Sequence, residues 1–122
     1  MDVVEHLLPN LKGRLSGMAL NVPIPDGCVI DLVTTLRRRV SAEEVNGAMR
    51  SAANSHLKGV LEYCTNPIVS SDVVGNAHSA IFDSLMTRVL GENMVKTCTW
   101  YDNGWGYANR VVDLIERVAA TL

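Results

Sequence analysis

The sequence has 122 residues, which is enough for one domain with its own hydrophobic core. Hydrophobic residues make up 48% of it and charged residues 20%, a balance that excludes an intrinsically disordered chain. The net charge of −2 excludes the basic surface that nucleic acid or an anionic membrane would require, so we expect neither as a partner.

Cysteine usage and the N-terminal residues favour a cytoplasmic protein. The three cysteines form no C-x-x-C pair, which is typical of free thiols in a reducing compartment. The first residues, Met-Asp-Val-Val-Glu-His, carry two acids before any apolar run, unlike a signal peptide. No apolar stretch approaches the roughly 20 residues of a membrane span.

The first third of the chain predicts a helix end followed by two strands. Residues 2–8 resemble the last turns of a helix, which Pro9 ends, and residues 14–22 predict a strand. A proline- and glycine-containing turn over 23–27 leads to a second strand over 29–40. Side chains alternate along this second strand, with one face predicted dry (Ile30, Leu32, Thr34, Leu36, Val40) and one wet (Asp31, Thr35, Arg37, Arg39).

The middle of the chain predicts one helix and several short strands. Ser41 and Glu44 have the spacing of a capping box, which opens a helix with a stripe of apolar residues up to about residue 55. Further strands are predicted over 59–63, 68–71, 79–83, 85–90 and 94–101. The loop 91–93 has a length typical of a hairpin.

The C-terminal residues 107–122 predict an amphipathic helix with an apolar stripe of Val111, Leu114, Ile115, Val118 and Leu122. We therefore predict one α+β domain over residues 1–122, with a mostly antiparallel sheet and helices packed on one face. No internal repeat occurs.

Several collinear blocks resemble the C-terminal part of glyceraldehyde-3-phosphate dehydrogenases. Trp-Tyr-Asp-Asn-Gly-Trp-Gly-Tyr at 100–107, followed by Arg-Val-Val-Asp-Leu at 110–114, is similar to that family's C-terminal signature. Matching blocks also begin at Leu8, Val22, Val29, Leu57, Val69 and His78. Collinear blocks over most of the chain are far more specific than one short motif.

The resemblance implies the fold of the family's catalytic domain and places the redox machinery elsewhere. It puts the nucleophilic cysteine, the histidine that activates it and the glycine-rich NAD loop upstream of these residues. We therefore expect no cofactor unless a partner supplies the Rossmann domain, and no dehydrogenase activity from these residues alone. In the family, the last helix packs onto that Rossmann domain.

Two positions depart from the family pattern, and two retain it. Asn21 stands where the family has its phosphate-binding arginine, and an amide cannot supply the forked charge of a guanidinium. Gly104 replaces the glutamate of the signature. Asn103 and Tyr107 match residues beside the nicotinamide, so the resemblance implies a cofactor-binding role for them that we interpret as vestigial.

The candidate catalytic residues, should this chain catalyse a reaction, are Asn21, Asp102, Asn103 and Tyr107. The three cysteines are interpreted as core residues, and no His or Cys spacing predicts a metal site. The run Arg37-Arg38-Arg39 is interpreted as a solvated edge strand, not a phosphate patch.

Three functional hypotheses follow. The first is a stand-alone remnant of the dehydrogenase scaffold, recruited to a non-redox step of a specialised biosynthetic pathway. The second is an assembly module, a homodimer or a partner-bound domain, because the apolar stripe of the last helix must be covered. The third is the C-terminal half of a split or truncated glycolytic enzyme.

Overall fold

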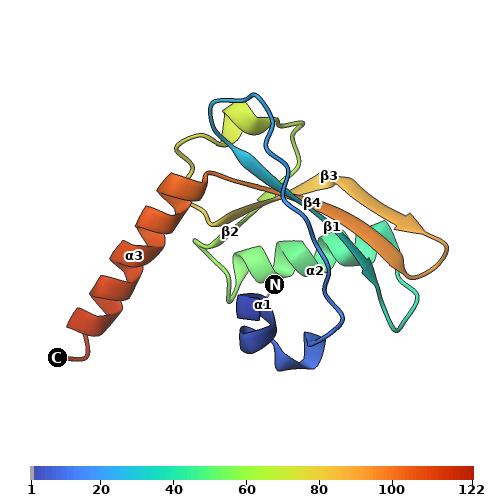
Figure 1. Ribbon diagram of the computed structural model, residues 1–122, viewed down its shortest axis with the longest axis horizontal. Helices are drawn as coiled ribbons and strands as arrows, with labels where there is room; N and C mark the ends of the chain where they lie inside the picture. Colours follow the sequence, from blue (N-terminus) through green and yellow to red (C-terminus); the bar gives the residue numbers. More distant parts are fainter. Residues whose placement is uncertain (1) are drawn as a thin grey trace.

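The computed structural model describes residues 2–122, so Met1 of the predicted domain lies outside the described residues. Its elements follow the chain from the N-terminal helix to the C-terminal helix (Figure 1). They are α1 (Asp2–Leu7), η1 (Pro9–Leu11), β1 (Cys28–Thr35), α2 (Ala42–Asn54), β2 (Leu61–Cys64), η2 (Ser70–Val73), β3 (Ala80–Leu90), β4 (Met94–Tyr101) and α3 (Asn103–Ala119).

The four strands form one mixed sheet with the order β1-β4-β3-β2. β4 lies in the middle and pairs antiparallel with both β1 and β3, while β2 runs parallel to β3 at the opposite edge from β1. Two of the three pairings are antiparallel, which confirms the predicted α+β class with a mostly antiparallel sheet. The predicted hairpin between the last two strands is confirmed as well.

The strand β3 is continuous, whereas the sequence predicts two separate strands over 79–83 and 85–90. The pairing register with β4 shifts between Asp83 and Arg88, which marks a β-bulge. Asn46 of α2 bridges this bulge, because its side chain donates to the Ser84 carbonyl (3.1 Å) and accepts from the Thr87 hydroxyl (2.7 Å). The irregularity that looked like a strand break is therefore a bend held by the helix.

The core lies on both faces of the β2–β3 half of the sheet. On one face, Phe82 and Leu61 pack against Ala53 of α2, and the Phe82 ring stacks on Tyr63 with 5.9 Å between the centroids. On the other face, Ile81 packs with Val73 of η2. The capping box predicted for α2 is confirmed, with Ser41 as the N-cap residue.

The strand β1 is shorter and more exposed than the sequence predicts. It ends at Thr35, not near residue 40, and its predicted dry face stays half exposed, with Ile30 at 51% and Leu32 at 47%. The reason is the position of α2, which packs on β2 and β3 and leaves β1 at the open edge (Figure 1). The alternation of apolar and polar side chains therefore predicts that β1 is a strand, but not whether another element packs on it.

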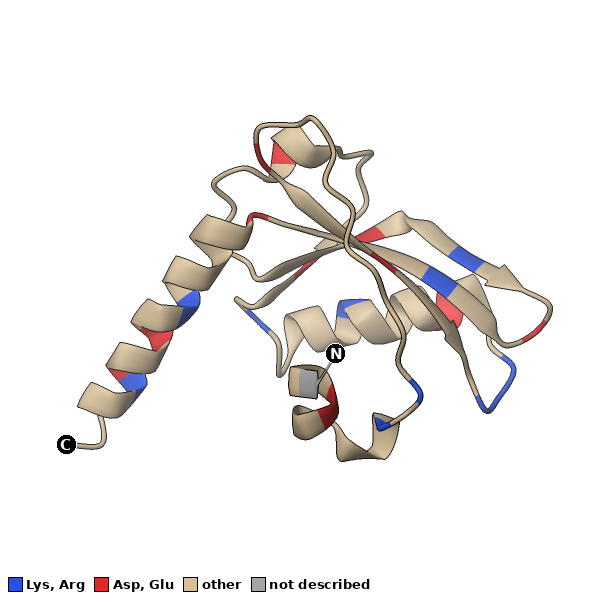
Figure 2. Cartoon of the chain, in the orientation of Figure 1, with Lys and Arg blue, Asp and Glu red and all other residues tan. Residues whose placement is uncertain are grey.

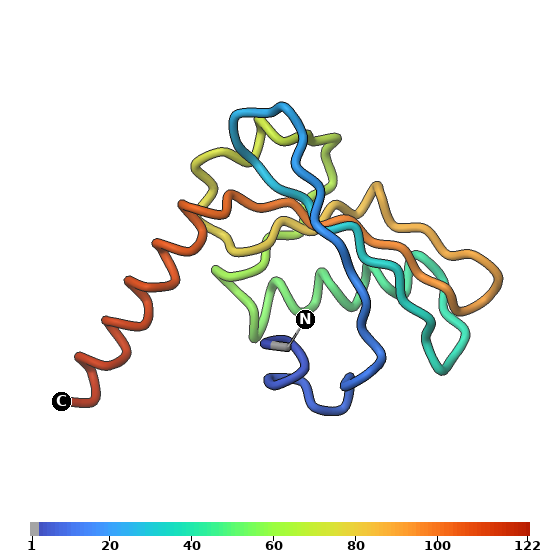
Figure 3. The backbone as a smooth tube through the Cα atoms, viewed as in Figure 1, coloured from blue at the N-terminus to red at the C-terminus, as the bar shows by residue number. Residues whose placement is uncertain are grey.

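Two other predicted strands are wrong. Residues 14–22 form no strand but an extended coil on the way to β1 (Figure 3), and its apolar side chains Met18 and Leu20 are about four-fifths exposed. Residues 68–71 lead into the 3₁₀ turn η2 instead of pairing. There Asp72 accepts a hydrogen bond from the Val69 amide (2.8 Å), a local contact that competes with strand pairing.

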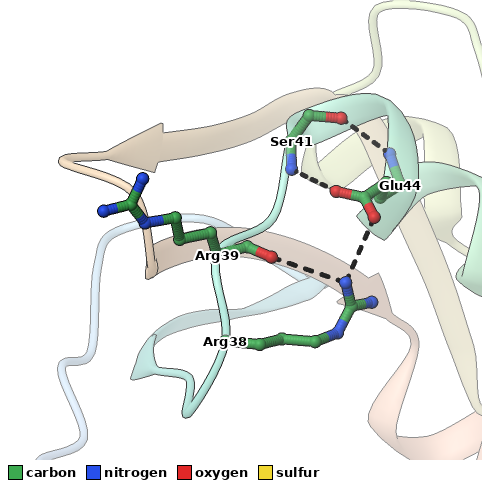
Figure 4. Close-up of polar contacts among 4 residues, drawn as sticks. All are labelled: Arg38, Arg39, Ser41 and Glu44. Carbon is green, nitrogen blue, oxygen red and sulfur yellow. Dashed lines mark hydrogen bonds and ion pairs between the residues drawn. The ribbon is translucent and has the colours of Figure 1, made fainter.

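The three arginines at 37–39 follow β1 in a loop instead of lying on the predicted strand. Arg38 pairs with Glu44 of the capping box (3.1 Å; Figure 4), and Arg39 pairs with Glu92 of the β3–β4 loop (2.7 Å). The Ser41 backbone amide, followed by Arg38, lowers the pKa of Glu44. Basic and acidic residues are interspersed over the molecule (Figure 2), so the arginines build no one-sign patch.

The helix α3 begins at Asn103, four residues before the predicted start, because Asp102 acts as its N-cap. Figure 1 shows that α3 extends away from the sheet, so within residues 2–122 α2 packs on one face of the sheet and the short turn η2 on the other. None of the helices in residues 2–122 is both long and apolar enough to cross a membrane.

Candidate functional site

The candidate residues Asp102, Asn103 and Tyr107 come together where β4 ends and α3 begins. Asp102 is buried, and one of its carboxylate oxygens (Oδ1) accepts the Trp105 amide (2.8 Å). Its other oxygen (Oδ2) accepts the amide of Gly75 in the loop after η2, also at 2.8 Å. These two amides, Gly75 first, lower the pKa of Asp102. The carboxylate therefore anchors the helix start with both oxygens engaged.

Asn103 and Tyr107 lie one helical turn apart on α3, so their side chains project from the same side of the helix. Both are exposed, and 71% of Tyr107 is accessible. Unlike Asp102, these side chains are available to touch a ligand or another protein surface.

An exposed apolar stripe continues from Tyr107 down α3. Its members recur at helical spacing, and most of them are half or more exposed, among them Leu114 (61%), Ile115 (61%) and Val118 (51%). Together with Ala119 and Leu122 they line an entirely apolar surface groove of about 360 Å³. We call Tyr107, Val111, Leu114, Ile115, Val118 and Leu122 the α3 stripe.

A different side of α3 faces the body of the protein. Gly106 is buried there, and a Cβ at that position would lie 3.0 Å from the His78 carbonyl oxygen. One turn on, Arg110 donates to the Gly59 carbonyl (2.9 Å) and pairs with Asp113 (3.0 Å). The helix is therefore held at its first turns only, and the stripe has no neighbour from residues 2–122.

Gly104 belongs to the exposed side of the helix. It stands three residues before Tyr107 and seven before Val111, the spacing that places side chains on one helical stripe. A Cβ there would have only the Asp102 carboxylate within 4 Å, at 3.7 Å. The position can carry a side chain, and its glycine leaves the start of the stripe uncharged.

Asn21 lies apart from the other candidates in its interactions. It is exposed in the extended coil between η1 and β1. Within residues 2–122 no hydrogen bond joins it to the start of α3. The four candidates are therefore one cluster of three and one separate exposed amide.

The cysteines are packing residues to different degrees. Cys64 and Cys98 are buried, as interpreted from the sequence, while Cys28 is only partly so. Burial, and then Asp31, raises the pKa of Cys98, which keeps its thiol protonated and poorly nucleophilic. In the described residues, no three His, Cys, Asp or Glu side chains gather as metal ligands.

A polar cluster that sequence reasoning missed joins β2 to the loop before β3. His78 Nδ1 lies 2.9 Å from Asn76 Oδ1 and 3.2 Å from Glu62 Oε2. Glu62 Oε2 also accepts a hydrogen bond from the side-chain amide (Nδ2) of Asn76 (2.8 Å). No spacing in the sequence points to this group, because parallel pairing of β2 with β3 brings Glu62 across from a distant segment.

The sequence matches one family model and several curated proteins over most of its length. Residues 2–103 match the family model described as glyceraldehyde 3-phosphate dehydrogenase, C-terminal domain. The chain is 52% identical over 116 residues to glyceraldehyde-3-phosphate dehydrogenase of Mycobacterium avium, and 51% identical to glyceraldehyde-3-phosphate dehydrogenase 2 of Bacillus subtilis (strain 168). Each match covers 95% of this chain but 34% of the relative.

The chloroplastic glyceraldehyde-3-phosphate dehydrogenase GAPA1 of Arabidopsis thaliana is 50% identical over the same length, which is 29% of that protein. The chain thus spans about a third of the curated relatives it matches. The family model ends at residue 103, so most of α3 lies beyond the matched range.

Proposed function

Because the chain belongs to the glyceraldehyde-3-phosphate dehydrogenase family, as its C-terminal domain, we propose that these residues act as an association half of a family assembly. In this role they supply a rigid sheet and a docking helix. The thiolate, the base and the NAD site come from another segment, either of the same polypeptide or of a separate one. Residues 1–122 by themselves are then not a dehydrogenase.

The α3 stripe is the observation that carries this proposal. A stretch of apolar side chains along four helical turns, with no cover from residues 2–122, is costly in water and is typical of a protein–protein contact. Since the core around Phe82 does not use α3, the stripe serves contact with another surface, not folding of this domain. The resemblance suggests the nucleotide-binding half as that surface.

Asn103 and Tyr107 fit the same role at the start of the stripe. Both side chains are exposed and are oriented by the helix. A partner docked on the stripe would bring its bound ligand close to them. Asp102 holds this end of α3 against the Gly75 loop, which fixes the direction in which both side chains project. We therefore assign Asp102 a positioning role, and Asn103 and Tyr107 a contact role.

Self-association is the form of docking open to the purified protein. Besides the stripe, the edge strand β1 exposes apolar side chains on both faces, among them Ile30 (51%) and Val33 (57%). Apolar surface on both sheet and helix favours a homodimer in the absence of another partner. A cytoplasmic setting is part of the proposal, because the three cysteines are free thiols.

Light scattering over a concentration series tests this proposal, together with a dehydrogenase assay that follows NAD reduction. We expect a concentration-dependent dimer and no NAD reduction by the purified 122 residues. A monomer that persists at high micromolar concentration would remove the proposed self-association. NAD reduction at an enzymatic rate would remove the proposed division of the active site.

A second candidate function is recruitment to a non-redox step, and Asn21 is the observation that favours it. Asn21 is an exposed amide at the position where the family pattern has a phosphate-binding arginine. Without that guanidinium, a phosphorylated substrate lacks its main charge partner at this position. Substitution Asn21→Arg in an assembly complemented with the nucleotide-binding half separates the two functions. Restored aldehyde oxidation after this single change favours a split dehydrogenase, whereas unchanged inactivity favours recruitment.

A further inference from the structure

A second concave surface lies away from the start of α3, where the last turn of α2 meets β2 and the loop before β3. It is a shallow, open depression of about 430 Å³, which we call the cleft. Its polar lining comes from α2, the turn after α2, β2 and the loop before β3, and it includes Arg50, Lys58, Glu62, Tyr63 and His78. Neither the redox residues of the family pattern nor the α3 stripe contributes to it.

Arg50 is held in a defined orientation over the aromatic wall of this cleft. Its guanidinium carbon lies 4.8 Å from the centroid of the Tyr63 ring, and its Nη2 lies 3.4 Å from the Tyr63 hydroxyl. Tyr63 in turn stacks on the buried ring of Phe82, which fixes the platform. Cation–π stacking leaves the outward donors of the guanidinium free for a planar or tetrahedral acceptor.

The opposite wall is ordered by the Glu62–Asn76–His78 cluster. Because His78 Nδ1 faces two oxygen acceptors, we assign its hydrogen to that nitrogen, which leaves Nε2 without a partner among residues 2–122. Glu62 already accepts from Asn76 and lies against His78, so part of its charge is compensated. The wall therefore presents an oriented imidazole and no strongly repelling carboxylate.

The charge balance of the cleft favours an anion. Neither Arg50 nor Lys58 takes part in an ion pair within residues 2–122. The cleft thus carries two uncompensated cations beside one partly compensated acid. The C-terminal carbonyls of α2 offset some of this charge, so binding should be modest, with a Kd on the order of 1 mM.

We propose that this cleft is a binding site for the oxyanion group of a small molecule, a carboxylate or a phosphate monoester, gripped by Arg50 and Lys58. The Tyr63 hydroxyl contributes a hydrogen bond that orients it, and His78 closes the opposite wall. The site is independent of the proposed assembly role, because it is formed by α2, β2, the turn between them and the loop before β3, and it needs neither the α3 stripe nor a partner.

Titration of the ¹⁵N-labelled protein at constant ionic strength, followed by amide NMR, tests this site. The probes are inorganic phosphate and acetate, with chloride as the background anion. We expect saturable shifts centred on Gly59, Tyr63 and His78, and about tenfold or more weaker binding in Arg50→Gln, as for loss of a charge-assisted hydrogen bond. Phosphate binding without acetate binding identifies a phosphate site, and the reverse identifies a carboxylate site.

The control is Arg37→Gln, which removes another exposed arginine that forms no ion pair within residues 2–122. It should leave the titration unchanged, while Lys58→Gln should weaken it without touching the Tyr63 stack. Shifts that stay linear, or that fall equally on residues 37–39, would show charge screening only and overturn the proposal. The same holds if both cleft variants bind like the parent protein.

Discussion

Replacing two residues of the α3 stripe by glutamine, Leu114→Gln with Val118→Gln, should separate association from folding. Burying a whole Leu or Val side chain yields about 1.5–3 kcal/mol. Leu114 is 61% exposed and Val118 51% exposed, so a partner gains roughly half of that at each position. The pair should therefore cost about 1.5–3 kcal/mol of association for each copy of the stripe in the contact, which is roughly a 10- to 150-fold weakening per copy.

Sedimentation equilibrium of the parent protein and the double variant measures this difference, and Val112→Gln serves as the matched control. Val112 is 53% exposed on the same helix, but it lies off the stripe. The control should associate like the parent protein. At a concentration where the parent is monomeric, all three should unfold at the same urea midpoint, because none of these residues enters the core. Equal weakening by Val112→Gln, or no weakening by the double variant, would refute the assignment of the stripe as the contact.

Three further changes test the fold and the start of α3. Phe82→Ala should lower the free energy of unfolding by about 3–5 kcal/mol, measured by urea denaturation, because the ring is 1% exposed and stacked on Tyr63. In the parent protein, the start of α3 should lose order in acid, and Asp102→Asn should abolish this pH dependence. The pKa of Asp102 is lowered on folding, so its contribution is present above the ordinary carboxyl pKa and is lost as the pH falls through the folded value. The protection of the Gly75 and Trp105 amides, relative to their intrinsic exchange rates at each pH, should therefore fall in acid in the parent protein, whereas an equal fall in the variant would contradict this role. Gly104→Glu should weaken self-association by placing a charge at the start of the stripe while leaving the urea midpoint unchanged, and sedimentation would contradict the stripe model if the dimer stayed intact.

Local chemistry accounts for the elements that the sequence predicts correctly. The capping box at Ser41, the alternation of β4 and the helical period of α3 are all short-range patterns, and each is confirmed. The start of α3 is less well predicted, because the N-cap role of Asp102 rests on its β-region backbone and its contact with Gly75, twenty-seven residues away in the chain.

The candidate site also has a part that the sequence predicts and a part that it does not. The sequence brings Asp102, Asn103 and Tyr107 together simply by their proximity in the chain, but it cannot tell that the first is buried and the other two exposed. It gives no sign of the cleft between Arg50 and His78, whose members meet only because β2 lies parallel to β3.

Residue identity and spacing along the chain are enough to predict the family, the α+β class and the amphipathic character of the last helix. Which surfaces are covered depends instead on how the segments pack in three dimensions. The helix α2 reaches β2 and β3 but not β1, and the stripe on α3 faces outward because Gly106 and Arg110 turn the opposite side to the body. Burial depends on which segments meet in space, and that is a property of the whole fold.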